Sequence, residues 1–279
     1  MSDKASAYLI HALNLMQHNA LHRSEVDWPE VRRSAALHAA GAQTTSDTYP
    51  AIYFALTQLR EHHSFLRIPD SLSGEQKREA LAASQSILGP WQREAKSPPP
   101  SPFRTRTEPE GHLFEAEGRT FAWITIPACS GKHSNWADNF EDFHTYATKL
   151  HAIAAGLQAS HPSGWIVDLR GNAGGNMWPM LAGIGFVLGD GVAGYFVSAD
   201  SSIEWSYQHG EASLQGKDMN NFSVGPPLSL PRLPNVAVLI DSGTVSSGEA
   251  IAISFQGRSS TRFFGSHTFG LSSANGMYP

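Results

Sequence analysis

Apolar side chains recur every three or four residues through positions 1–96, which is the spacing of amphipathic helices. The pattern predicts four helices, over residues 8–16, 28–40, 47–63 and 73–88. The start of the second is the best marked, because Asp27 stands as an N-cap before Trp28-Pro29-Glu30, with proline in the first turn. One stripe of the third helix carries three apolar residues and a histidine: Ile52, Leu56, Leu59 and His63.

After residue 103 the pattern changes to short apolar runs that alternate with helical periodicity. Strands are predicted at 113–116, 120–126, 165–167, 195–197, 236–240 and 261–264. Helices are predicted at 140–157, 180–188 and 247–256. The segment 200–234 has little periodicity and is predicted to be a long loop. Strands that alternate with helices are typical of a layered α/β domain.

Residues 97–102 read Ser-Pro-Pro-Pro-Ser-Pro, which suits neither a helix nor a central strand and predicts an extended linker. This linker is the best domain boundary in the chain. The sequence thus predicts a helical cap domain at 1–96, the linker at 97–102 and an α/β core at 103–279.

Composition places the chain among folded globular proteins, since 41% of its 279 residues are apolar and 16% are charged. A formal net charge of -5, without a cluster of Lys and Arg, argues against a nucleic-acid partner. The single cysteine, Cys129, excludes an internal disulfide and a cysteine-rich metal site. Neither a metal nor another cofactor is expected, because a row of histidines on one helix lacks an accompanying carboxylate pair: His11, His18 and His22.

The first residues lack the continuous apolar run of a signal peptide or a membrane span, since polar side chains interrupt them at His11, Asn14 and Gln17. The sequence as given therefore predicts a cytoplasmic protein. A secreted or periplasmic location would follow instead if a signal peptide had been removed.

The segment Gly243-Thr244-Val245-Ser246-Ser247-Gly248-Glu249-Ala250 follows one predicted strand and opens a predicted helix. A turn of this kind can present a serine hydroxyl as a nucleophile. Ser246 and Glu249 also match the capping-box pattern, in which the hydroxyl accepts a helical N–H. From spacing alone, the cap is the commoner use of this pattern.

A second strand end, residues 168–176, opens into a glycine turn. Gly174 and Gly175 have two interpretations. They make a tight turn between strand and helix, or one of them supplies a backbone N–H that joins the N–H of Ser247 around an oxyanion.

Two histidines compete for the role of general base. His63 shares its stripe with apolar residues, so it is either a core histidine or a base. Its neighbour His62 points about 100° away on an ideal helix and is expected to be solvated. His267 stays open as a rival base. Asp168 and Arg170 are expected to pin the glycine turn through an ion pair rather than to act on substrate.

Together these segments resemble the family of C-terminal processing (tail-specific) peptidases, which also contains the core of tricorn protease and the interphotoreceptor retinoid-binding proteins. Five segments carry the resemblance in the family's order: Val26-Asp27-Trp28, Leu59 to Leu66, Gly164 to Gly175, Ser246 to Glu249 and Gly265 to Gly270. The resemblance implies an α/β core of the crotonase and Clp-protease kind, preceded by a helical cap, and a polypeptide or peptide substrate.

In this family the nucleophile stands three residues before a supporting glutamate, which makes it Ser246, before Glu249. The lysine-dependent branch takes its base from the position after Thr-Phe-Gly, and that position is Leu271, which cannot accept a proton. The tricorn-like branch takes a histidine from the helical region, and the matching residue is His63. The resemblance therefore implies a serine-type endopeptidase with Ser246 and His63 as its catalytic residues.

The chain departs from the family pattern in two places. Too few residues lie between Leu66 and Phe103 for the peptide-binding PDZ domain of many relatives. Relatives also continue past the position of Pro279, so the α/β core is expected to be truncated at its C-terminus. An unfinished sheet edge there would favour pairing with another chain, and hence a homo-oligomer.

Two other functions stay open at this point. The first is a non-catalytic ligand-binding or scaffolding relative, with Trp205, Tyr207 and Phe222 as a pocket wall. The second is an acyl-thioester hydrolase or isomerase, because crotonase-like folds polarise thioesters through paired backbone N–H groups without a serine nucleophile.

Overall fold

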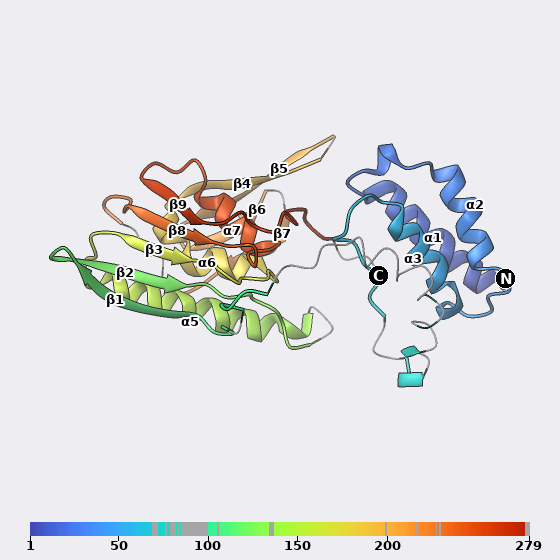
Figure 1. Cartoon of the computed structure of the whole chain (residues 1–279), viewed down its shortest axis with the longest axis horizontal. Coiled ribbons are helices and arrows are strands. Elements are labelled where there is room, and N and C mark those ends of the chain that lie inside the picture. Colours follow the sequence, from blue (N-terminus) through green and yellow to red (C-terminus); the bar gives the residue numbers. More distant parts are fainter. Residues whose placement is uncertain are drawn as a thin grey trace. The chain divides into compact units, whose positions relative to one another are not determined.

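The computed structural model describes residues 1–68, 72–75, 77–78, 82, 84, 100–104, 106–133, 137–198, 200–215, 217–226, 228 and 230–276. The chain falls into two compact units, one of Met1–Ser97 with Asn275–Pro279 and one of Pro98–Ala274 (Figure 1). Each unit has its own hydrophobic core. The two are described in turn below.

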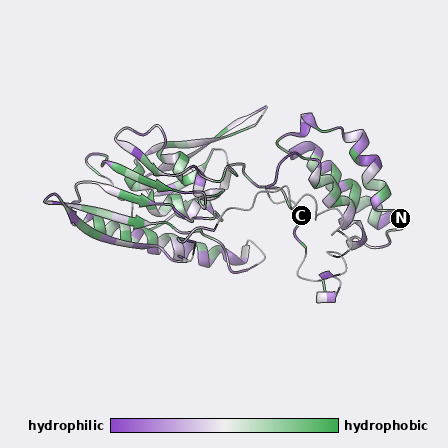
Figure 2. Ribbon diagram, viewed as in Figure 1, coloured by the Kyte–Doolittle hydropathy of each residue, from purple (hydrophilic) through white to green (hydrophobic). Residues whose placement is uncertain are grey.

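The first unit is helical, as its periodicity predicts. It contains α1 (Asp3–Asn19), η1 (Arg23–Glu25), α2 (Trp28–His38), η2 (Ser46–Thr48) and α3 (Tyr49–Thr57). The predicted N-cap of α2 is confirmed, because Asp27 Oδ1 accepts a hydrogen bond from the N–H of Glu30 at 3.1 Å. Figure 2 shows hydrophobic and hydrophilic residues on different sides of these helices, so the core of this unit forms from their apolar sides.

The prediction of a third helix as far as His63 is wrong. Helix α3 ends at Thr57, and Arg60 has a φ of +56°, which an α-helix cannot accommodate. Beyond it the carboxylate of Glu61 accepts the backbone N–H of His63 at 2.7 Å and that of Ser64 at 3.1 Å. This side-chain turn competes with helical hydrogen bonding. Most of the predicted helix 73–88 and residues 97–99 of the predicted linker lie outside the described residues.

The second unit is built on a five-stranded sheet. Its strands are β1 (Glu110–Ala116), β2 (Arg119–Thr125), β3 (Trp165–Asp168), β8 (Val236–Ile240) and β9 (Thr261–Gly265), in the order β1-β2-β3-β8-β9. The hairpin β1–β2 is antiparallel, and β2, β3, β8 and β9 run parallel. The carboxyl ends of β3 and β8 therefore lie side by side, so the loops that follow them emerge at the same edge of the sheet.

A second sheet occupies most of the segment predicted to be a loop. It is antiparallel and contains β4 (Gly191–Val197), β5 (Ser202–Gln208), β6 (Glu211–Leu214) and β7 (Lys217–Ser223). The prediction failed because only Trp205 and Tyr207 mark the inward face of β5, between polar residues that hide the alternation. These two rings and that of Phe222 are buried in the core, so they do not form the predicted pocket wall.

Three helices accompany the sheets: α5 (Phe140–Gln158) after the short η3 (Ala137–Asn139), α6 (Met177–Leu188) and α7 (Ser247–Phe255). Helix α6 is buried on nearly all sides, because it packs against α5, α7 and strands of the second sheet. The predicted α/β class is thus confirmed. Among the described residues, no helix combines the length and the apolar character needed to cross a membrane.

Candidate active site

Ser246 lies in the predicted turn between β8 and α7, as the N-cap residue of α7. Its backbone has φ +55° and ψ -118°, a conformation that residues with a Cβ rarely adopt. Its side chain is half-buried. A strained, partly accessible serine at the start of a helix is a feature of functional sites, where surrounding contacts hold the strain.

The contacts that hold this turn come from Glu249. The carboxylate Oε2 of Glu249 accepts the backbone N–H of Ser246 at 2.8 Å, which is the glutamate half of the predicted capping box. The N–H of Glu249 in turn donates to the carbonyl oxygen of Ser246 at 2.8 Å. The serine hydroxyl is therefore at most a secondary acceptor for that N–H, and its capping role is the weaker half of the box.

The same carboxylate reaches the segment after β9. Glu249 is 3% exposed, and it accepts the N–H of Gly270 at 2.7 Å and, on Oε2, the N–H of Leu271 at 2.9 Å. Leu271 and Ser246 thus share one acceptor oxygen. The backbone of position 271 lies close to the serine, where the leucine side chain offers no group that could take a proton.

The glycine turn after β3 meets the serine turn, as the sequence predicts. A Cβ atom placed on Gly174, which has φ +97°, would lie 2.9 Å from Ser246 Cβ and 3.2 Å from Ser247 N. The Ser247 hydroxyl donates to the carbonyl oxygen of Gly175 at 2.6 Å. Residues some seventy positions apart in sequence therefore form one site, and only glycine at 174 permits so close an approach.

Three backbone N–H groups at this site were candidates for an oxyanion hole. The N–H of Gly174 donates to Asn172 Oδ1 at 2.9 Å. Within the described part of the chain, the N–H groups of Gly175 and Ser247 donate to no acceptor. These two can therefore bind a developing negative charge without breaking an existing hydrogen bond.

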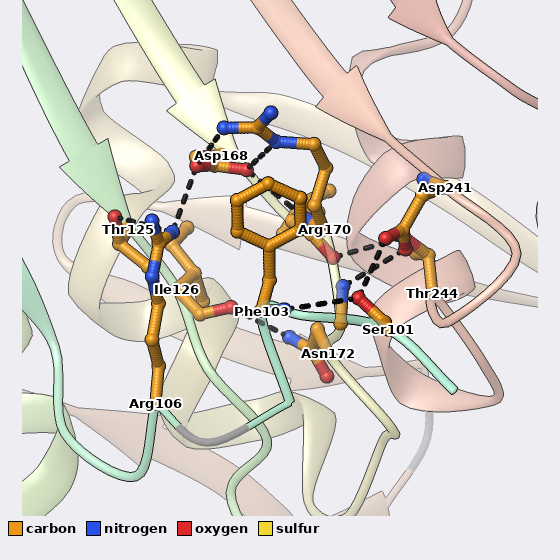
Figure 3. A network of polar contacts seen from close by, with 12 residues as sticks. Ser101, Phe103, Arg106, Thr125, Ile126, Asp168, Arg170, Asn172, Asp241 and Thr244 are labelled. Carbon is orange, nitrogen blue, oxygen red and sulfur yellow. Dashed lines mark hydrogen bonds and ion pairs between the residues drawn. The ribbon is translucent and has the colours of Figure 1, made fainter.

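The predicted ion pair between Asp168 and Arg170 is present and is joined by a second arginine (Figure 3). Asp168 is fully buried and accepts from Arg170 Nε and Nη2, both at 2.8 Å, and from Arg106 Nη1 at 2.9 Å. Burial raises the pKa of this carboxyl, but the hydrogen bonds from Arg170 and Arg106 outweigh burial, and the net pKa lies below its usual value.

The aromatic ring of Phe103 lies within this network. The guanidinium of Arg170 stands 4.0 Å from the ring centroid and that of Arg106 5.0 Å (Figure 3). The ring therefore lies against both arginines, and the network ties the segment that follows the proline-rich stretch to the strand end at Asp168.

Sequence reasoning missed Asp241 and Asn172. Asp241 Oδ1 accepts the N–H groups of Gly171 and Gly243, each at 2.9 Å, and its Oδ2 accepts the Ser101 hydroxyl at 2.8 Å (Figure 3). An aspartate directly after a buried strand and shortly before a glycine is a signal that could have found the first. Asn172 stood inside a quoted motif, but its contacts are with residues far away in sequence.

His63 lies in the first unit, in the turn held by Glu61, and its side chain is half-buried. The interpretation of His63 as a core histidine on a helical stripe is therefore wrong, because the helix ends before it and the ring is not enclosed. His62 is exposed, as predicted. The approach of His63 to Ser246 stays a prediction.

His267 lies in the second unit and is exposed. It lines a shallow surface hollow with the end of β9, together with Ile240, Phe263, Phe264, Gly265 and Ser266. The imidazole is accessible to solvent there, and the role of His267 as a rival base also stays a prediction.

Cys129 lies beside the glycine turn but is unsuited to act as a nucleophile. It is 3% exposed, and its N–H donates to the carbonyl oxygen of Gly174 at 3.0 Å. Burial raises the pKa of its thiol to about 12, so the thiol stays protonated at neutral pH. Among the described residues, His, Cys, Asp and Glu side chains form no group of three suited to a metal ion.

Comparison with known proteins agrees with this arrangement. The model of peptidase family S41 matches residues 122–279. The chain is 28% identical over 269 residues to the nisin-resistance protein of Lactococcus lactis subsp. lactis, covering 96% of this chain and 71% of that protein.

Two solved structures share the fold. One is a lipoprotein from Streptococcus agalactiae, with a TM-score of 0.61, 18% identity, and coverage of 100% of this chain and 81% of that one. The other is the photosystem II D1 C-terminal processing protease, with a TM-score of 0.59, 12% identity, and coverage of 97% and 83%.

Proposed function

The chain belongs to peptidase family S41, and we propose that it is a serine-type endopeptidase in which Ser246 is the nucleophile and His63 the general base. The observation that carries the proposal is the meeting of Ser246 with Gly174 and with the N–H of Ser247. A half-buried hydroxyl beside backbone N–H groups without acceptors is the arrangement that acyl transfer requires.

In the proposed reaction, His63 accepts the proton of the Ser246 hydroxyl as its oxygen bonds to the carbonyl carbon of the substrate peptide. The tetrahedral oxyanion then collapses. The carbon–nitrogen bond breaks, and His63 returns the proton to the leaving amine. A water molecule next attacks the acyl-enzyme ester with His63 again as the base, which releases the new carboxylate and restores the serine.

The backbone N–H groups supply the stabilisation of the oxyanion. Each such donor typically lowers the barrier by about 3 to 4 kcal/mol. Glu249 supports them, because it fixes the backbone of Ser246 through the 2.8 Å hydrogen bond. Asp168 and Arg170 support them from a greater distance, by holding the strand end from which the glycine turn begins.

Peptides are the substrate class. The relative named nisin-resistance protein aligns with 96% of this chain, so nisin is a rational test peptide beside a general unstructured substrate such as casein. Cleavage of nisin but not of casein would indicate a narrow peptide specificity within the same chemistry.

A fluorophosphonate probe tests the nucleophile directly, because it reacts with activated serine hydroxyls. We expect labelling of the wild-type chain at Ser246, and a roughly 1000-fold or greater loss of both labelling and peptide hydrolysis in Ser246→Ala. The exposed Ser259 provides a matched control, since Ser259→Ala should label like the wild type. Labelling of a different serine, or hydrolysis that survives Ser246→Ala, would overturn the proposal.

The two other candidate functions give different outcomes in the same assay. Saturable binding of an apolar ligand, without labelling, would indicate a ligand-binding relative. Turnover of an acyl thioester that survives Ser246→Ala would indicate thioester chemistry through the N–H groups alone. Since Trp205, Tyr207 and Phe222 are core residues, the pocket once expected for an apolar ligand is not formed by them.

A further inference from the structure

Asn172 is fully buried beneath the glycine turn, and its side-chain amide is completely used. Its Nδ2 donates to the carbonyl oxygens of Ile126 at 2.9 Å and Pro127 at 3.3 Å, and its Oδ1 accepts the N–H of Gly174 at 2.9 Å. The orientation of the amide is unambiguous, because two carbonyl groups face one end and an N–H faces the other.

The peptide group between Gly174 and Gly175 is held at both ends. The carbonyl oxygen of Gly174 accepts the N–H of Cys129 at 3.0 Å, and the N–H of Gly174 is bound by Asn172. In a trans peptide the C=O and the following N–H point in opposite directions. The N–H of Gly175 is therefore directed away from Cys129.

Asn172 also connects the glycine turn to the serine turn. Its carbonyl oxygen accepts the N–H of Val245 at 2.8 Å. A Cβ atom placed on Gly248 would lie 2.9 Å from Asn172 Oδ1, so the first turn of α7 packs directly against this side chain. One residue thus fixes the position of Gly174 relative to Ser246.

We infer that Asn172 is a positioning residue for the oxyanion site. By binding the N–H of Gly174 it removes that group from the site, and it leaves the N–H groups of Gly175 and Ser247 as the two donors to the oxyanion. The inference rests on the proposed function and adds to it a choice between Gly174 and Gly175 and the side chain that makes that choice.

The first test compares Asn172→Ala with Asn176→Ala. Asn176 is a matched control, since it is an asparagine in the same loop, it is 5% exposed, and its Oδ1 accepts a backbone N–H, that of Trp178, at 3.1 Å. A peptide aldehyde serves as the oxyanion probe, because the serine adds to it to form a tetrahedral adduct. We expect Asn172→Ala to lower kcat and weaken aldehyde binding by about 10- to 100-fold, with KM within about threefold of the wild type.

A merely structural role would lower the melting temperature of both variants without this pattern. If Asn172→Ala matches Asn176→Ala in kcat, KM and aldehyde affinity, the inference is overturned. The same holds if the losses in Asn172→Ala fall on KM with aldehyde affinity unchanged.

The second test uses the wild-type chain and does not depend on the folding of a variant. With ¹⁵N-labelled glycine and serine, the amide proton resonances of Gly175 and Ser247 should move downfield on formation of the aldehyde adduct, while that of Gly174 should stay near its position. A downfield shift of Gly174 with Gly175 unmoved would refute the assignment.

These outcomes are distinguishable from failure of the proposed function. If the wild-type chain does not react with a fluorophosphonate at Ser246, the peptidase proposal itself fails. If it reacts and hydrolyses peptides, but the donor pair includes Gly174, only the role given to Asn172 fails.

Discussion

Glu249 Oε2 accepts the backbone N–H of Ser246 at 2.8 Å, and this contact holds the serine at a φ of +55°. Because Glu249 also accepts the N–H groups of Gly270 and Leu271, one buried carboxylate joins the start of α7 to the segment after β9. The strained conformation of the serine is thus maintained by a charged acceptor with three donors.

Replacement of Glu249 by glutamine should therefore relax the serine turn. The amide NH₂ would face at least one N–H donor, which leaves a buried donor without an acceptor. We expect Glu249→Gln to lower the free energy of unfolding by about 1 to 3 kcal/mol and kcat by about 10- to 100-fold. Urea unfolding and peptide hydrolysis measure the two effects. The exposed Glu115 gives a control, and equal behaviour of Glu115→Gln and Glu249→Gln would contradict the role of the carboxylate.

Substitution of Gly174 by alanine should abolish activity, since the new Cβ would lie 2.9 Å from Ser246 Cβ. The matched control is Gly118→Ala in the β1–β2 turn, where φ is +68° and an added Cβ meets no atom of the described residues within 4 Å. Both variants pay for a positive φ, typically about 1 kcal/mol. Only Gly174→Ala should also lose fluorophosphonate labelling, and a labelled, active Gly174→Ala would mean that the two turns are farther apart.

The choice between His63 and His267 can be made by paired variants. If His63 is the base, His63→Ala should lower kcat by about 100- to 10,000-fold while His267→Ala stays near the wild type. The opposite result would move the base to the second unit. Melting temperatures of both variants establish that each chain is folded when its activity is measured.

The stability of the protein should fall at acid pH because of Asp168. Its folded pKa lies below the usual value of 3.8, since the bonds from Arg170 and Arg106 outweigh the effect of burial. The ionised carboxylate therefore contributes stability that is complete above pH 3.8 and is lost as the pH falls through the folded pKa.

Urea unfolding between about pH 2 and pH 6 measures this dependence. We expect Asp168→Asn to be about 3 to 5 kcal/mol less stable near pH 6, because two arginines lose their partner, and to show a flatter pH profile below pH 4. An unchanged slope in this variant would show that other carboxyls cause the loss.

The thiol of Cys129 should resist modification in the native chain. With a pKa of about 12 and little exposure, it should react with iodoacetamide at pH 8 far more slowly than the unfolded chain does. Peptide hydrolysis should survive the treatment. Rapid alkylation of the native chain with loss of activity would contradict both the burial of the thiol and the choice of a serine nucleophile.

Much of the secondary structure follows from local signals. The strand before Ser246 and the helix after it were predictable, because an apolar run, a glycine turn and a capping box stand next to one another in sequence. The end of α3 was not, since the turn at Glu61 depends on which backbone N–H groups the carboxylate reaches. The strand β5 was missed because two aromatic residues are a weak alternation without knowledge of the core they enter.

The identity of the donors at the site could not be read from the residues alone. The sequence left Gly174 and Gly175 equivalent, and the difference arises from Asn172, whose amide is anchored on Ile126, 46 positions earlier. Asp241 was missed for the same reason, because its partners Gly171 and Ser101 are 70 and 140 positions away.

By itself, then, the sequence determined the α/β character of the second part, the serine turn, the glycine turn and the absence of a lysine base at Leu271. These depend on hydrophobic periodicity and on residue types at short spacing, which neighbours in the chain fix. The tertiary structure alone decided that Ser246 is strained, that Gly174 touches it, and which N–H groups keep no acceptor. Hydrogen bonds of that kind are allotted among groups that only folding brings together, so competition between distant acceptors decides them.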